Sequence, residues 1–117
     1  MTSKIKIKRA YEPPAASDGA RILVDRLWPR GVSKEQLNIV YWAKSVSPSN
    51  DLRKWYGHDP EKWEEFRARY FRELGANPEG LHELAGHLKS GTVTFLYSSK
   101  EPEINNAVAL RDYLKQH

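Results

Sequence analysis

Short apolar runs typical of β-strands occur at four places along the chain. Residues 4–8 alternate Lys and Ile, which predicts a strand with one solvated face. The segment 20–27 contains the unbroken apolar run Ile22-Leu23-Val24, a pattern typical of a strand buried on both faces of a parallel sheet. Residues 39–43 and 92–97 predict a third and a fourth strand.

The stretch between the third and fourth of these segments predicts three helices. Each expected start pairs a capping residue with a proline, a combination typical of helix N-termini, at Ser47-Pro48, Asp59-Pro60 and Asn77-Pro78. Gly57, Gly75 and Gly91 mark the expected ends. The middle helix carries an apolar stripe that predicts a role in the core rather than in ligand stacking, namely Trp63, Phe66, Tyr70 and Leu74.

Two more helical segments complete the pattern. Ser33 and Gln36 have capping-box spacing and predict a short helical turn, and residues 103–115 predict a final helix. Strands separated by helices indicate the α/β class. We therefore expect one domain over 1–117, with a mainly parallel sheet of about four strands, helices packed on it, and the second and fourth strands adjacent.

Composition narrows the functional classes. The chain contains no Cys, which excludes disulfides and thiol chemistry, and its apolar runs are far too short for a membrane span. The N-terminus lacks the apolar core of a signal peptide, so a cytoplasmic location is expected. The formal net charge of +4 is compatible with acidic ligands but also with simple solubility.

The densest polar cluster follows the second strand, where Asp25, Arg26 and Arg30 lie close together around Trp28. The carboxyl end of a strand in an open α/β sheet is a common ligand site. Asp25 would then act as a general base while the two arginines hold a phosphate or carboxylate. The alternative is that Asp25 pairs with one arginine and braces the loop. Two cations for one carboxylate favour an anion site.

Two other segments offer polar side chains. His58 is a candidate acid or base, although a His in such a turn more often steadies the backbone. Trp28 and Arg53 are candidate ligand-binding residues, and the side chain of Arg53 reaches either the sheet end or solvent. The loop after the fourth strand predicts an anion cradle, with helix capping by Ser98 as the alternative reading. Its candidate ligand-binding residues are Tyr97, Ser98, Ser99, Lys100 and Asn105. Asn105 and Asn106 either face the pocket or are simply polar residues of the first helical turn.

These residues resemble the YeaO-like family, a bacterial family of small proteins classed as a domain of unknown function. The most specific string is Val-Asp-Arg-Leu-Trp-Pro-Arg-Gly at 24–31, and the likeness extends over about residues 9–114. The resemblance implies an α/β fold of this length but brings no established activity. Larger relatives carry a Cys-containing loop after the last strand. Here that loop reads Ser-Ser-Lys-Glu-Pro at 98–102, so thiol chemistry does not carry over.

The sequence thus favours a small polar pocket that binds an anionic molecule, with an enzymatic role open. One alternative is a protein-interaction domain without chemistry. The other is a nucleic-acid-binding or regulatory module that uses the basic N-terminal strand together with Arg67, Arg69 and Arg72. Neighbouring glutamates cancel most of the positive field of those arginines. The histidines at 58, 82, 87 and 117 lack metal-site spacing, and no nucleotide-binding glycine motif occurs. No metal or cofactor is therefore expected.

Overall fold

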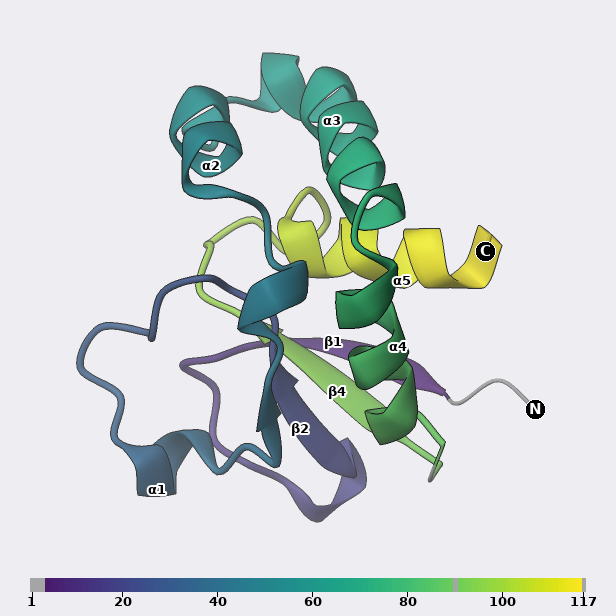
Figure 1. Ribbon diagram of the computed structural model, residues 1–117. Helices are drawn as coiled ribbons and strands as arrows, with labels where there is room; N and C mark the ends of the chain where they lie inside the picture. The colour runs from purple at the N-terminus through teal and green to yellow at the C-terminus, as the bar shows by residue number, and fades with distance from the viewer. Residues whose placement is uncertain (1–3, 90, 117) are drawn as a thin grey trace.

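Four parallel strands form the sheet on which the rest of the chain packs (Figure 1). The computed structural model describes residues 4–89 and 91–116. The strand order is β1-β4-β2-β3, and every neighbouring pair is parallel. The strands are β1 (Ile5–Arg9), β2 (Ala20–Leu23), β3 (Tyr41–Trp42) and β4 (Val93–Tyr97). The predicted α/β class and the adjacency of the second and fourth strands are confirmed.

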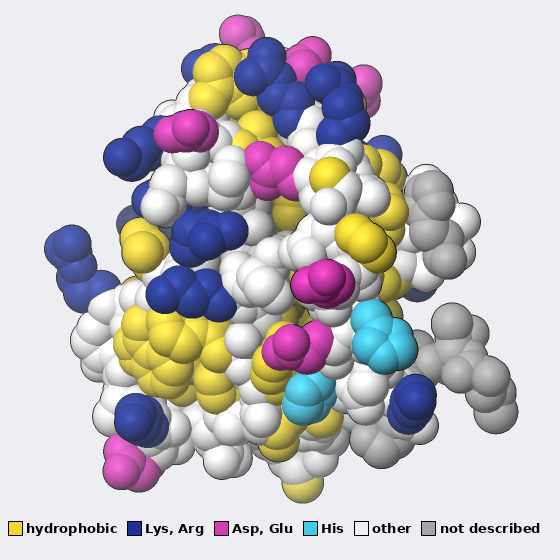
Figure 2. Space-filling model, in the orientation of Figure 1, with side chains coloured by type: hydrophobic (Ala, Val, Ile, Leu, Met, Phe, Trp, Pro, Cys, Tyr) yellow, Lys and Arg dark blue, Asp and Glu magenta, His cyan; other side chains and the backbone are white. Residues whose placement is uncertain are grey.

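Five α-helices surround this sheet: α1 (Lys34–Leu37), α2 (Asn50–Tyr56), α3 (Trp63–Gly75), α4 (Pro78–His87) and α5 (Asn106–Gln116). Short 3-10 turns lie at η1 (Ala16–Asp18), η2 (Lys44–Val46) and η3 (Pro60–Lys62). Helix α5 contacts β1 and β4, and α3 packs on α5, so that α2 and α3 form the end of the molecule away from the sheet (Figure 1). Side chains of both charges cover that end on the face in Figure 2. No helix in the described part of the chain is long and apolar enough to cross a membrane.

The apolar run of β2 is buried on both faces, as its pattern predicts. Ile22 and Val24 join Phe95 in the main core, which lies under α3, α4 and α5. Leu23 and Leu96 point to the opposite face, where the loop that carries α1 covers them. Residues 25–40 therefore cross this face of the sheet. The polar cluster begins directly after β2, at the start of this segment.

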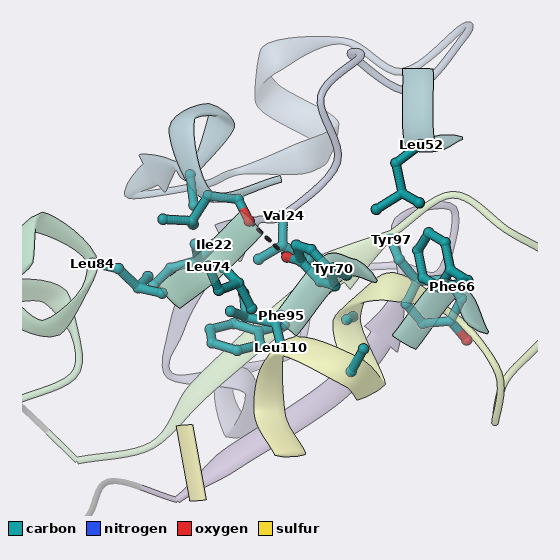
Figure 3. Close-up of a cluster of buried hydrophobic side chains, with 14 of the residues drawn as sticks. Ile22, Val24, Leu52, Phe66, Tyr70, Leu74, Leu84, Phe95, Tyr97 and Leu110 are labelled. Carbon is teal, nitrogen blue, oxygen red and sulfur yellow. Dashed lines mark hydrogen bonds between the residues drawn. The ribbon is translucent and has the colours of Figure 1, made fainter. Parts of the chain in front are cut away.

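The stripe on α3 is part of the main core (Figure 3). Phe66, Tyr70 and Leu74 are each at most 2% exposed, and the Tyr70 hydroxyl donates to the Val46 carbonyl at 2.6 Å. This bond fixes α3 to the segment that follows β3. Burial, together with nearby carboxylates, raises the pKa of Tyr70 well above its ordinary value, so the hydroxyl stays a donor. Trp63 is only half-buried, at the helix start.

The lysines of β1 lie on an edge strand, and their ammonium groups have partners nearby. Lys6 donates to the Ser17 carbonyl at 3.1 Å, and Lys8 donates to the carboxylate of Asp18 at 3.1 Å. Arg21 also binds that carboxylate from β2. Burial alone would raise the pKa of Asp18, but hydrogen bonds from the Ala15 amide, Lys8 and Arg21 outweigh it and hold this pKa below its ordinary value.

Several element boundaries differ from the sequence prediction. β2 ends at Leu23 rather than at residue 27, although the Val24 amide still donates to Leu96 at 3.1 Å. Ser49, not Ser47, caps α2, because the Ser47 hydroxyl is turned inward to the carbonyls of Val24 and Ala43.

Two helix ends and the third strand also differ from the sequence prediction. α5 begins at Asn106 instead of residue 103, since Asn105 supplies the cap through a bond from the Val108 amide at 3.0 Å. The third strand is limited to Tyr41–Trp42, and α4 ends at His87, before Gly91. The predicted caps Ser33, Asp59 and Asn77 are confirmed.

Candidate anion-binding site

A pocket of about 360 Å³ opens at the carboxyl ends of β2 and β4. Its walls come from the loop after β2, from α2 and the turn that follows it, and from the loop between β4 and α5. Parallel strands place their carboxyl ends at one edge of a sheet, which is why these distant segments meet. The expected position of the site is therefore the position of this pocket.

Asp25 lines the pocket with a carboxyl group held by neutral donors. The Ser98 amide donates to Oδ2 at 2.9 Å, and Asn106 Nδ2 donates to Oδ1 at 2.9 Å. Neither arginine of the same loop pairs with it, so the structure contradicts the alternative in which Asp25 braces the loop through an ion pair. Burial raises the pKa of Asp25, and the hydrogen bonds from Asn106 and from the side chain and amide of Ser98, together with the nearby His58, only partly offset that rise.

Three arginines line the pocket, and no carboxylate in the described part of the chain forms an ion pair with any of them. Arg26 donates from Nε to the Pro48 carbonyl at 2.9 Å and from Nη2 to the Ser47 carbonyl at 3.2 Å. Its Nη1 has no protein partner within residues 4–89 and 91–116. These bonds hold the Arg26 guanidinium at the wall with one N–H group free for a ligand.

The other two cations have weaker attachments. Arg53 reaches only Asn50 Oδ1, at 3.4 Å, and its Nε is buried without an acceptor. Arg30 is exposed at the rim, and its side chain has no hydrogen bond to the described residues, while its carbonyl accepts from the Tyr11 hydroxyl at 3.1 Å. A buried donor without an acceptor is costly, so the protein itself holds the Arg53 guanidinium less firmly than that of Arg26.

His58 occupies the turn between α2 and η3 with φ of 60°, a left-handed conformation that few residues other than glycine adopt. The side chain is exposed, lines the pocket and lowers the pKa of Asp25. A backbone held in this region often marks a functional site, because the surrounding structure must maintain it. His58 is thus brought to the same pocket as Asp25, as the sequence predicts.

Aromatic side chains form the apolar wall. Tyr56 and Phe66 stack with their ring centroids 4.3 Å apart. Trp28 lines the pocket on the loop after β2, where its indole N–H donates to the Val32 carbonyl at 2.6 Å. Phe66 belongs both to the core and to the pocket, so the apolar stripe on α3 fills the core and also contributes to the pocket lining.

The structure brings most of the predicted site residues together and leaves two outside. Tyr97 packs in the main core instead of lining the pocket, because it is the last residue of β4 and faces the helices. Lys100 is exposed beyond the rim. The predicted residues that line the pocket are Asp25, Arg26, Trp28, Arg30, Arg53, His58, Ser98, Ser99 and Asn105.

The loop after β4 differs from a helix-terminus anion cradle. Ser99 Oγ accepts from the Glu101 amide at 3.0 Å, and α5 starts only at Asn106, so Ser98 does not cap the helix. Arg9 Nε donates to the carbonyls of Ser98 and Ser99, at 3.3 and 3.0 Å, which ties this loop to β1. The loop contributes Ser98 and Ser99 to the pocket through a fixed backbone.

The sequence does not indicate Tyr56 and Phe66 as lining residues, and it leaves the position of Asn106 open. Asn106 Nδ2 donates to both the Val24 carbonyl and Asp25, at 2.9 Å each, so it orients the carboxyl group. Its position in the first turn of an expected helix was the available signal. No sequence signal marks Tyr56 as a pocket residue, since an apolar residue at a helix end ordinarily belongs to the core.

Metal-ligating side chains do not gather in this pocket. Within residues 4–89 and 91–116, no three His, Asp or Glu side chains lie together as a metal ion would need. His117, the last of the four histidines considered from the sequence, lies outside the described residues.

Comparison with known proteins places the chain in a family. Residues 4–117 match the family model described as the inactive DUF488-N3 subclade. The chain is 41% identical to the uncharacterized protein YeaO of Escherichia coli (strain K12), over 95% of this chain and 96% of that protein. It is 44% identical to the uncharacterized protein Rv3073c of Mycobacterium tuberculosis (strain ATCC 25618 / H37Rv), over 96% of this chain and 94% of that protein. No solved structure matches the chain significantly. The chain therefore belongs to the inactive DUF488-N3 subclade, the YeaO-like family that the string at 24–31 indicates.

Proposed function

We propose that this protein binds a small molecule bearing a phosphate or carboxylate group in the pocket at the strand ends. The observation that carries the proposal is a charge imbalance. Arg26, Arg30 and Arg53 line one pocket without carboxylate partners in the described chain, and Asp25 is the one acidic residue that lines it with them. Guanidinium groups bind phosphate and carboxylate through charge-assisted, often bidentate, hydrogen bonds.

A single carboxylate cannot neutralise three guanidinium groups, so the pocket keeps an excess of positive charge. The pocket is also partly enclosed by apolar side chains, and low-dielectric walls strengthen the field of the arginines on a bound anion. Arg26 is already fixed by two backbone carbonyls, which reduces the entropy lost on binding.

Binding without catalysis is the better-supported role. The matching family model is described as an inactive subclade. Asp25 and His58 share the pocket and would supply proton transfer in an enzyme, but Asp25 accepts a hydrogen bond at each of its oxygens, an arrangement that also suits a fixed recognition group. We therefore assign Asp25 to ligand recognition.

The nucleic-acid alternative has less support. Lys6 and Lys8 of the basic strand donate to nearby protein groups. On α3, Arg69 pairs with Glu65 at 2.8 Å, and charged side chains of both signs are interspersed over this end of the molecule (Figure 2). A nucleic-acid surface would instead present a continuous stripe of unpaired cations.

Thermal unfolding with phosphate tests the proposal. Phosphate should raise the melting temperature of the parent beyond chloride at matched ionic strength, because a ligand that binds only the native state stabilises it. Arg53→Gln and Arg30→Gln should lose most of that extra rise. Arg72→Gln is the matched control. The substitution removes the same charge, and Arg72 is exposed on α3 outside the pocket lining.

Phosphate also stabilises proteins generally through exclusion from their surface, so the comparison between variants decides the result. The control should keep the full rise of the parent. Equal rises in the parent and in all three variants would contradict the proposal and make the pocket arginines structural braces.

A further inference from the structure

Two residues that line the pocket, Asp25 and Asn106, keep unused hydrogen-bond acceptor positions. Asp25 accepts hydrogen bonds from Asn106 and from the amide and hydroxyl of Ser98, whereas a carboxylate has about four acceptor positions. Asn106 uses Nδ2 twice, and its carbonyl oxygen has no partner among the described residues. The anion-binding role uses neither of these acceptors, because both repel a phosphate or carboxylate.

The opposite charges divide the pocket into two ends. An anionic group is attracted to the arginines and repelled by the Asp25 carboxylate, so it binds away from Asp25. The group that meets Asp25 and Asn106 must therefore donate a hydrogen bond. Three arginines in the same pocket repel a cation, which favours a neutral N–H or O–H group over an ammonium.

The apolar lining of the pocket suits a flat ring. Tyr56 and Phe66 are almost fully buried behind it, and the accessible part comes from the loop after β2, where Leu27 is 55% exposed and Trp28 is half-buried. Aromatic side chains bind rings through offset or edge-to-face contacts and add to the gain from apolar burial. A volume of about 360 Å³ accommodates a molecule with one or two rings.

We propose that the bound molecule is an aromatic acid that also carries a neutral N–H or O–H donor, with its anionic group on the arginines and its donor on Asp25. This inference rests on the proposed anion-binding function and extends it to the class of ligand. Asn106 and the Ser98 amide act as positioning groups, because they hold the Asp25 oxygens in place before the ligand arrives.

Matched pairs of small acids test this inference by calorimetric titration. The probes are meta- and para-hydroxybenzoate, each compared with the methylbenzoate in which a methyl group replaces the hydroxyl at the same position. For the better-placed position, the parent should bind the hydroxy acid about tenfold more tightly, the gain expected from one hydrogen bond to a charged acceptor. In Asp25→Asn this preference should fall to about twofold or less, because the charged acceptor is lost.

Variants of the arginines separate the two proposals. Arg53→Gln should weaken both members of a pair by the same factor and leave their ratio unchanged, while Arg72→Gln should change nothing. Binding that depends on Arg53 but shows no hydroxyl preference would overturn the inference and leave the anion-binding function intact. Binding of phosphate without binding of any of the benzoate probes would also overturn the inference and leave the anion-binding function intact. If no probe, phosphate included, depends on Arg53, both proposals are overturned.

If the Asp25→Asn variant does not fold, the affinities measured for the parent protein still test the donor assignment. Equal affinities within both probe pairs overturn the donor assignment by themselves. A hydroxyl preference that persists in a folded Asp25→Asn variant also overturns it, since the donor would then meet another group.

Discussion

Asp18 and Asp25 are two carboxyl groups removed from water whose pKa values shift in opposite directions. Burial pushes both upward, but Asp18 receives hydrogen bonds from two cationic side chains and an amide, which reverse the shift. Asp25 receives hydrogen bonds from neutral groups only, the Asn106 amide and the amide and hydroxyl of Ser98, and the shift of its pKa stays upward. Asp18 is therefore a structural group, whereas Asp25 still lacks a charged or strongly donating partner, which a ligand would provide.

The structural role of Asp18 predicts a pH-dependent effect of its replacement. Asp18→Asn should lower the free energy of unfolding at neutral pH by about 3 kcal/mol, because Arg21 is left buried without its anion. The pKa of Asp18 is lowered in the fold, so its contribution is complete above the unfolded value of 3.8 and is lost as pH falls through the lower folded value. Urea unfolding at several pH values measures the difference.

The difference between parent and Asp18→Asn should therefore shrink below about pH 4. Glu103→Gln is the control, since Glu103 is exposed and should show a small effect at every pH. A difference that stays constant as pH falls would contradict the assignment of Asp18 as an ionised structural group.

At the scale of elements, one buried hydroxyl contributes to the attachment of α3. Tyr70 donates to the Val46 carbonyl at 2.6 Å in the core, which connects α3 to η2. Tyr70→Phe should cost about 1–3 kcal/mol, because it leaves this buried carbonyl unpaired. Tyr11→Phe makes the same chemical change at an exposed hydroxyl that binds the Arg30 carbonyl, and should cost well under about 1 kcal/mol.

Chemical denaturation of the two variants measures both values. If Tyr11→Phe proved as costly as Tyr70→Phe, burial would not govern the strength of these bonds. A neutral Tyr70→Phe would show that the attachment of α3 does not need the bond to Val46.

The sequence predicts the elements well where local chemistry decides their limits. Ser33, Asp59 and Asn77 were identified as caps because each acts on its own neighbours. Ser47 was misplaced as a cap because its hydroxyl serves a long-range contact with the Val24 carbonyl. The start of α5 was placed early for a related reason: the capping group is Asn105, and the apolar pattern does not distinguish it from the residues before it.

At the scale of the whole molecule, the pocket is a product of strand order. β2 and β4 are neighbours, so the loops that leave them meet, and Asp25 reaches the Ser98 amide at 2.9 Å across 73 residues of sequence. The sequence predicts this meeting through the two continuous apolar strands. It does not predict that Tyr56 and Phe66 supply the wall, because a helical apolar stripe looks the same whether it faces a core or a pocket.

Arg53 gives the most direct view of the central claim, that the pocket binds an anion. Its Nε–H is buried without an acceptor, whereas Arg69 Nε–H already donates to Glu65 at 2.8 Å. Nuclear magnetic resonance of the arginine Nε–H groups during a phosphate titration compares the two. The account predicts a saturable shift of the Arg53 resonance with the Arg69 resonance unmoved. An Arg53 resonance that stays in place, or one that drifts in parallel with Arg69 without saturating, would contradict it.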